Sequence, residues 1–182
     1  MRLLMAVLLL ALAAGCASVP PTVPAVATPA ANWILQGRIG VQAGEQSLSG
    51  NIRWQHRVET DEVLVTSPLG QGVARIVRNA DGVTLEAPNR PPRRAPDAES
   101  LTREALGYAL PVAGLAWWVQ ARPDPERGFE ATHDGSGRVV QLKQDGWVID
   151  YLQYAADARP RKLVVAREGL EIRLVADSWQ AE

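Results

Sequence analysis

Few residues of this chain have the types and spacing that catalysis or metal binding requires. The histidines are His56 and His133, and the single cysteine is Cys16, so the chain lacks a Cys/His metal cluster of the usual spacing. No serine lies in a nucleophile-elbow pattern, and Gly70-Gln71-Gly72 lacks the third glycine of a dinucleotide-binding fingerprint. The sequence therefore predicts neither a metal nor a cofactor, and nothing in it argues for an enzyme.

The cysteine follows a short targeting segment. Arg2 precedes an apolar run, residues 3–12, and then come small residues, which is the order of a secretory signal. The run is shorter than the roughly 20 apolar residues that span a bilayer. Ala14-Gly15-Cys16 resembles the bacterial lipobox, which implies acylation of the Cys16 thiol; the alternative is an ordinary signal peptide with an incidental cysteine. Ala17 follows, where an inner-membrane lipoprotein of this kind has aspartate, which implies the periplasmic side of the outer membrane.

Composition divides the chain into three parts. Residues 1–15 form the predicted signal peptide, residues 16–32 an uncharged, proline-rich linker, and residues 33–182 one domain of ordinary size. Removal of the signal peptide takes away one charge, Arg2, and leaves 18 basic and 20 acidic residues. This slightly acidic balance argues against a nucleic-acid binder.

The domain is predicted to be mainly β. From Trp33 onward apolar and polar residues alternate, and turn signals such as Asp145-Gly146 separate the runs. About ten short strands are expected, in the pattern of an all-β barrel or sandwich. Residues 88–96 break the pattern, after which Asp97 is expected to cap one helix and a second short helix follows Pro111. Helices in this central position are expected to cover one opening or edge of the sheet.

Two loops stand out from the strand pattern. In Pro68-Leu69-Gly70, the proline and the glycine favour a tight turn with Leu69 at its tip. Leu69 either folds back onto the core or acts as an apolar probe that contacts something outside the protein. The second loop carries Arg90, Arg93 and Arg94, and is either a solvated stretch or a contact for an acidic partner or lipid headgroups.

The aromatic composition is unusual, with six tryptophans and one phenylalanine. Tryptophan brings a large apolar area and an N–H that needs a partner. These side chains either fill the interior of a barrel or, beneath a removable helical lid, line an apolar cavity. The residues predicted to line such a cavity are Trp33, Leu35, Ile39, Ile52, Trp54, Leu106, Leu115, Trp118, Trp147, Ile149 and Tyr151.

Short motifs follow one another along the domain in a distinctive order. They are Gly37-Arg38-Ile39-Gly40-Val41, Ser49-Gly50-Asn51-Ile52-Arg53-Trp54, Thr66-Ser67-Pro68-Leu69-Gly70-Gln71-Gly72, Leu110-Pro111-Val112, and Asp145-Gly146-Trp147 followed by Tyr151, Tyr154 and a closing strand up to Trp179. Together they resemble the LolB family, the outer-membrane lipoprotein receptors of the bacterial lipoprotein localisation pathway.

The resemblance implies both a fold and a function. The fold is an incompletely closed antiparallel β-barrel with a helical insert covering the opening. Its apolar interior accepts the acyl chains of triacylated lipoproteins from the periplasmic carrier LolA, and an apolar loop residue, here Leu69, helps to insert them into outer-membrane lipid. A monomer is the simplest carrier of this kind. The alternatives are a structural or assembly outer-membrane lipoprotein with a filled barrel, and a lipidated hydrolase, for which the sequence offers no catalytic triad.

Overall fold

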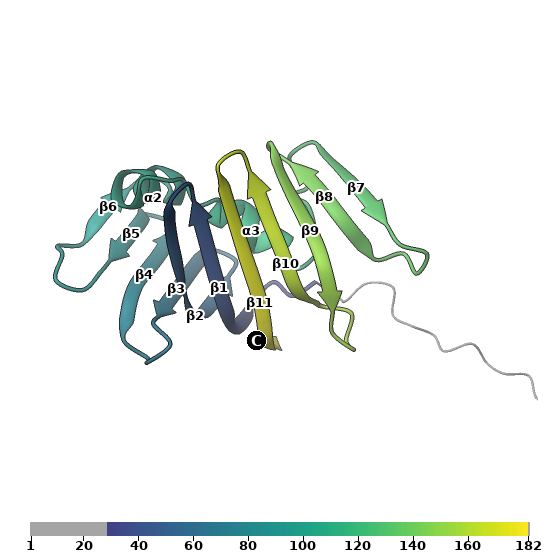
Figure 1. The fold of residues 1–182 in the computed structure, drawn as a ribbon, viewed down its shortest axis with the longest axis horizontal. Coiled ribbons are helices and arrows are strands. Elements are labelled where there is room, and N and C mark those ends of the chain that lie inside the picture. Colours follow the sequence, from purple (N-terminus) through teal and green to yellow (C-terminus); the bar gives the residue numbers. More distant parts are fainter. Residues whose placement is uncertain (1–28, 182) are drawn as a thin grey trace, which may run out of the picture.

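The computed structural model describes residues 29–181 as one antiparallel sheet with two short helices (Figure 1). Cys16, the predicted signal peptide and most of the predicted linker lie outside the described residues. No described helix has the length and hydrophobicity needed to cross a membrane. The elements in chain order are β1 (Trp33–Ala43), β2 (Gln46–Arg57), β3 (Thr60–Thr66), β4 (Gly72–Asn79), β5 (Gly82–Glu86), β6 (Arg93–Ala95), α2 (Ala98–Leu106), α3 (Val112–Trp118), β7 (Phe129–His133), β8 (Val139–Gln144), β9 (Trp147–Tyr154), β10 (Pro160–Arg167) and β11 (Leu170–Ala181).

The sheet is a meander whose first and last strands meet at its centre. The strand order is β6-β5-β4-β3-β2-β1-β11-β10-β9-β8-β7, and every neighbouring pair is antiparallel. β6 and β7 form the two edges, and no ladder joins them within residues 29–181. Figure 1 shows the sheet curving between these edges. The prediction of an incompletely closed antiparallel barrel is confirmed.

Glycine lets the central strands approach one another closely. The register between β1 and β11 shifts between Gln36 and Gly37, which marks a bulge that bends the sheet. A Cβ atom at Gly37 would collide with the carbonyl oxygen of Val175, and one at Gly50 would collide with that of Thr66. No other residue fits these two positions without moving the neighbouring strand.

Both helices lie in the connection between β6 and β7. Asp97 caps α2 as predicted, because its carboxylate accepts a hydrogen bond from the Ser100 backbone N–H at 2.7 Å, and Gly107 ends the helix with φ of 85°. α3 buries Leu115 and Trp118 in the hydrophobic core. Figure 1 shows α2 beside β5 and β6, and α3 behind the central strands. The predicted helical insert therefore covers the inner side of the sheet.

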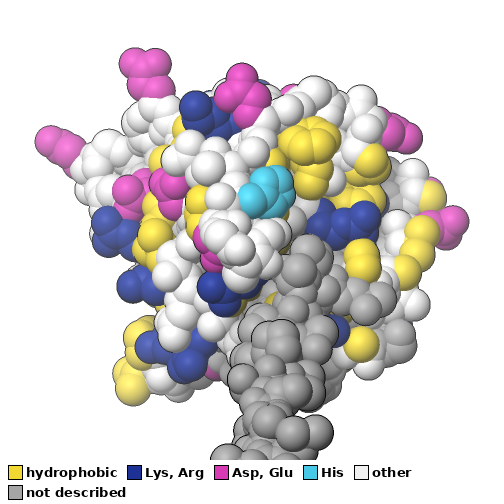
Figure 2. All heavy atoms as spheres, turned by 90° about the vertical axis from the view of Figure 1, so that its right-hand side faces the viewer, with side chains coloured by type: hydrophobic (Ala, Val, Ile, Leu, Met, Phe, Trp, Pro, Cys, Tyr) yellow, Lys and Arg dark blue, Asp and Glu magenta, His cyan; other side chains and the backbone are white. Residues whose placement is uncertain are grey.

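The two edge strands differ from the sequence prediction. Residues 93–95, in the stretch expected to interrupt the sheet, pair with β5, and residues 129–133 pair with β8. An edge strand forms hydrogen bonds on one side only and tolerates charge and nearby proline, so it lacks the alternation that marks inner strands. Figure 2 shows the face on the β7 side, where hydrophobic side chains are interspersed with charged ones.

The start of β1 and the Leu69 loop lie at opposite ends of β3. Trp33 pairs with His56, close to the β2–β3 hairpin. β3 then runs from Thr60 to Thr66, away from that hairpin and toward Leu69. Before β1, the backbone N–H of Ala30 donates to Gln120 Oε1 at 3.1 Å, just after α3.

Candidate functional site

The inner face of the β1–β5 half of the sheet is hollow. A cavity of about 340 Å³ lies between these strands, the β5–β6 loop and the two helices. Its strand walls are apolar, and Arg90 and Arg93 of the β5–β6 region line it as well. An apolar cavity of this size fits the usual range for small ligands, roughly 300–1,000 Å³.

Several short side chains leave this space open. Val63 and Val65 of β3, and Ala74 and Ile76 of β4, stand at alternate positions and face the cavity. Leu85 of β5 continues the same wall. Because valine and alanine are short, these residues leave a gap beneath α2.

The β8–β11 half of the same sheet is filled. Trp118 of α3 and Trp147 of β9 are buried, with ring centroids 6.1 Å apart. The indole N–H of Trp118 donates to Gln144 Oε1 at 2.9 Å, and its carbonyl oxygen accepts from the Tyr151 hydroxyl at 2.8 Å. Burial raises the pKa of Tyr151 well above its ordinary value, so the hydroxyl remains a donor.

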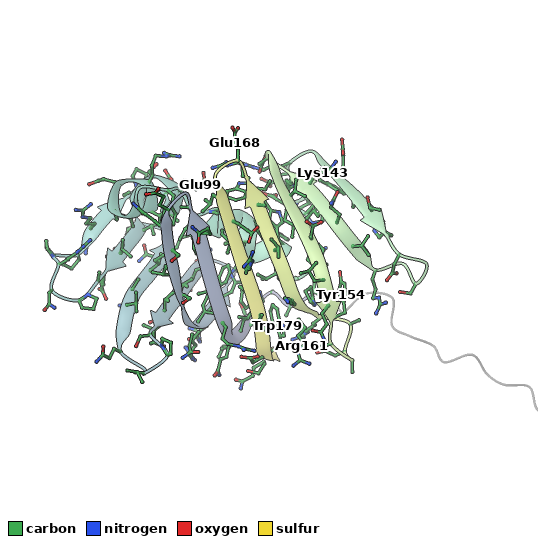
Figure 3. All side chains as sticks on the ribbon, viewed as in Figure 1. Glu99, Lys143, Tyr154, Arg161, Glu168 and Trp179 are labelled. Carbon is green, nitrogen blue, oxygen red and sulfur yellow. The ribbon has the colours of Figure 1, made fainter. Side chains whose placement is uncertain are left out.

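The lower end of this half is held by aromatic side chains. Figure 3 shows Tyr154 and Trp179 at the lower ends of β9 and β11, with Arg161 nearby. The Tyr154 hydroxyl donates to the Val139 carbonyl oxygen, and burial raises the pKa of Tyr154 to about 12. The Trp179 indole N–H donates to the Pro160 carbonyl oxygen at 3.4 Å. These contacts join neighbouring strands and leave this half no comparable apolar hollow among the pockets described for residues 29–181.

The structure divides the predicted cavity residues into two groups. Ile39, Ile52, Trp54 and Leu115 line the cavity. The side chain of Leu106 lies outside what the structure describes. The others are buried in the core away from the cavity wall, and they are Trp33, Leu35, Trp118, Trp147, Ile149 and Tyr151.

Sequence reasoning missed the valine and alanine positions that make up much of the wall. The period-two pattern marks Val63, Val65 and Ala74 as inward-facing, and this signal was available in the sequence. The register that sets Val65 opposite Ala74 is a contact between strands. Local pattern therefore identifies inner positions without telling which of them surround empty space.

The loop between β3 and β4 presents Leu69 to solvent. The Ser67 backbone N–H donates to the Gln71 carbonyl oxygen at 2.8 Å, and the Gly70 N–H donates to the Ser67 carbonyl oxygen at 2.9 Å. Gly70 has φ of 83°, the left-handed conformation that glycine tolerates. The turn leaves the Leu69 side chain 89% exposed. Of the two sequence interpretations, the structure excludes a leucine folded back onto the core.

A buried carboxylate supports the cavity wall at the far end of β3. Asp61 accepts hydrogen bonds from Trp54 Nε1 at 2.9 Å and Arg78 Nε at 2.6 Å, and His56 Nδ1 lies 2.6 Å from the same carboxylate. Burial alone would raise the pKa of the Asp61 carboxyl, but these partners, His56 first, hold it below its ordinary value. The charged carboxylate thus fixes the indole of Trp54 where it borders the cavity.

The remaining polar side chains do not form a metal site within residues 29–181. No group of three or more His, Cys, Asp and Glu side chains there is placed to hold an ion. His133 is exposed at the end of β7, far along the sheet from His56 on β2. The described site is therefore an apolar cavity with an exposed leucine loop.

Comparison with known proteins identifies the family. A family model described as outer membrane lipoprotein LolB matches residues 31–179. The chain belongs to the LolB family. The outer-membrane lipoprotein LolB of Thiobacillus denitrificans is 65% identical over 169 residues, covering 92% of this chain and 91% of the relative. That of Nitrosomonas europaea is 39% identical over 155 residues, covering 82% and 73%.

Solved structures share the fold at low sequence identity. A LolA superfamily protein from Nitrosomonas europaea superposes with a TM-score of 0.55 at 12% identity, covering 86% of this chain and 89% of that one. A DUF1329 family protein from Desulfovibrio piger gives a TM-score of 0.52 at 8% identity, covering 84% and 86%. At these identities the likeness shows the fold alone.

LolB membership settles the class of protein. Members of the LolB family are outer-membrane lipoproteins and act as lipoprotein receptors rather than enzymes. The predicted outer-membrane localisation and receptor function are thereby confirmed, and lipoproteins are the partners. A site built from apolar walls, with no catalytic constellation among its lining residues, is consistent with a protein that binds its cargo without changing it.

Proposed function

We propose that the cavity receives the acyl chains of triacylated lipoproteins from the periplasmic carrier LolA and that the Leu69 loop helps to deliver them into outer-membrane lipid. The apolar cavity of about 340 Å³ carries this proposal. It also argues against the alternative of a structural lipoprotein with a filled barrel. The other predicted features belong to the same proposal: a signal peptide over residues 1–15, acylation at Cys16, a linker to residue 32, and a monomeric domain from residue 33.

A receptor of this kind is needed because free lipoproteins cannot cross water at a useful rate. Three acyl chains expose roughly 40 methylene groups, and at about 0.8 kcal/mol each their transfer to water costs on the order of 30 kcal/mol. A cavity placed mouth to mouth with the donor's lets the chains remain in apolar surroundings. Transfer then needs no nucleotide, provided that each acceptor binds the chains more favourably than the donor.

The helix α2 and the β5–β6 loop form one side of the cavity. Ala105 of α2 and Pro88 and Arg90 of the loop line it. α2 packs against β5, the edge strand β6 and α3, so we expect α2 and the β5–β6 loop to move outward when cargo enters.

Acyl-chain transfer tests the proposed cavity. LolA is loaded with a radiolabelled triacylated lipoprotein and mixed with this chain from residue 17 onward, which lacks the acylation site. We expect the label to move to this chain without nucleotide. The control is that the same loaded LolA passes its cargo to another LolB protein. If the label nevertheless stays on LolA when this chain is added, the proposed acceptance from LolA is wrong.

The Leu69 loop is tested with a matched pair of leucines. Burial of one leucine is worth about 1.5–3 kcal/mol, enough for reversible contact with a bilayer. Leu69→Glu should still accept the lipoprotein but deliver it to liposomes on the order of tenfold more slowly. Leu152→Glu is the control, because Leu152 is also exposed (57%) but lies on β9. Equal delivery by the two variants would contradict the role proposed for Leu69.

A further inference from the structure

The apolar Leu69 loop and the basic β5–β6 loop lie at the same end of β4 and β5, beside the cavity. Arg75 of β4 pairs with Glu86 of β5, so the chain before Arg75 and the chain after Glu86 run toward the same end of these two antiparallel strands. The first leads back to the Leu69 loop and the second forward into the β5–β6 loop. Both contribute to the cavity lining, through Val73 and Pro88. Figure 1 shows both loops on the left side of the molecule.

The β5–β6 side of this mouth carries uncompensated positive charge. Arg93 lies 3.6 Å from Glu104, and Glu86 is bound by Arg75 at 2.9 Å. Arg90 and Arg94 are exposed, and neither side chain has a hydrogen-bond or ion-pair partner among residues 29–181. Two free guanidinium groups therefore lie on the β5–β6 side of the mouth: Arg90 lines the cavity, and Arg94 takes the alternate position on β6, opposite Thr84.

We propose that Arg90 and Arg94 bind the phosphate groups of membrane phospholipid and hold the mouth of the cavity against the bilayer while Leu69 enters its apolar layer. The inference rests on the proposed function of the Leu69 loop. The guanidinium group matches phosphate oxygens with paired N–H donors. In a bilayer the phosphates lie just outside the apolar layer, so arginines at the same end of the sheet as an apolar tip match the order of groups that the tip meets. Prolines 88, 91 and 92 restrict the β5–β6 backbone, which lowers the entropy lost on binding.

The position of the two arginines favours a membrane over an acidic protein. A basic patch alone fits either partner. Here the loop that carries Arg90 and the loop with a leucine that is 89% exposed lie at the same end of β4 and β5, and a leucine at the tip of a turn fits a fluid apolar layer without any complementary pocket. An acidic protein partner is therefore the competing outcome of the experiment.

The test places a fluorescent reporter on the loop of the lipidated mature protein. Gln71→Cys supplies a thiol for an environment-sensitive dye, since Cys16 is the only other cysteine and is acylated under the proposed function. The protein is reconstituted in phosphatidylcholine vesicles with or without phosphatidylglycerol, and dye emission gives the ratio of docked to undocked loop. Arg90→Gln and Arg94→Gln should each lower this ratio about fivefold on anionic vesicles, and 1 M salt should remove most of the difference.

Arg161→Gln is the matched control. Arg161 is an exposed arginine of β10, and Figure 3 shows it at the lower end of that strand, away from the two loops on the left. This variant should dock like the parent protein. A general effect of net charge would lower docking for all three variants and would overturn the inference.

The remaining outcomes separate this inference from the proposed function. If Leu69→Glu abolishes docking while both arginine variants dock normally, the arginine inference is wrong and the role of Leu69 stands. If the arginine variants dock normally but take lipoprotein from loaded LolA more slowly, the patch binds an acidic protein instead. If Leu69→Glu also docks and delivers lipoprotein normally, the proposed role of the Leu69 loop fails as well.

Discussion

The β1–β5 half and the β8–β11 half of this sheet have the same alternation of inner and outer residues, yet one is hollow and the other filled. On the filled side, the rings of Trp118 and Trp147 occupy the space between helix and sheet. On the hollow side, Val65 of β3 and Ala74 of β4 are neighbours across the two strands, and both line the cavity. The size of the inward side chains therefore decides whether a curved sheet encloses a cavity or a packed core. The alternation of inner and outer residues does not decide this.

Filling the hollow half should have the largest effect on function. Ala74→Trp places an indole in the cavity, where it takes the space of several methylene groups worth about 0.8 kcal/mol each. We expect acceptance of lipoprotein from LolA to fall on the order of a hundredfold, measured as label transferred at equilibrium. The control is Ala156→Trp, which adds the same group to the exposed β9–β10 turn. Undiminished acceptance by a folded Ala74→Trp variant would show that this cavity is not where the chains bind.

A matched pair of valines tests whether the filled half loses more stability on truncation than the hollow half does. Val165 is fully buried in the filled half, whereas Val65 borders the cavity. Truncation to alanine removes more contacts from Val165, because the void beside Val65 supplies no partner atoms. Urea unfolding should give a loss of about 2 kcal/mol for Val165→Ala and about 1 kcal/mol for Val65→Ala. Equal losses would mean that the cavity is packed in solution.

The smallest expected effect is a pH dependence of stability that arises from Asp61, at the end of β3 far from the Leu69 loop. The folded protein holds the pKa of Asp61 below its ordinary value of 3.8. Deprotonated Asp61 therefore adds stability at neutral pH, and this contribution is lost as the pH falls below about 4 toward the folded-state pKa. Asp61→Asn should be less stable at pH 7 and should lose less stability between pH 5 and pH 2.5.

The control for Asp61 is a carboxylate of the other half. Hydrogen bonds from Ser136 and Arg138 also lower the pKa of Asp134, but its side chain, in the β7–β8 turn, is 28% exposed, whereas that of Asp61 is 1% exposed. Asp134→Asn should therefore change the acid unfolding profile less than Asp61→Asn. A larger change for Asp134→Asn would contradict the importance assigned to burial of Asp61.

The parts of the fold that were predictable are those encoded locally. Asp145 and Gly146 adopt φ of 53° and 76°, as the Asp-Gly signal of a tight hairpin requires, and Asp97 caps α2 through its own side chain. β6 and β7 were not predicted, because an edge strand is held by a partner on one side and carries little burial pattern. The pairing of β1 with β11 joins the two ends of the domain, and no local signal encodes it.

For the candidate site, too, the part that depends on local sequence was predictable and the part that depends on distant contacts was not. The exposed tip at Leu69 follows from Pro68 and Gly70, which act within the turn itself. The cavity was expected where the large aromatic residues are. Trp54 does line it, but Trp118 fills space in the other half, and smaller side chains such as Val65 make up much of the cavity wall. Finding the hollow requires the register between strands and the position of α2, which depend on contacts between distant residues.

The attachment of the chain at Trp33 affects how the Leu69 loop meets a membrane. The loop lies at the opposite end of β3, roughly 20 Å away at about 3.3 Å per residue. If Cys16 is acylated as proposed, a fully extended stretch of residues 16–32 would span about 50 Å, and the anchor and the tip of Leu69 would reach the same leaflet. The anchor would then keep the loop at a high effective concentration near the bilayer. Under that confinement a contact worth only a few kcal/mol is enough for frequent visits, and it is weak enough for the loop to leave again after each delivery.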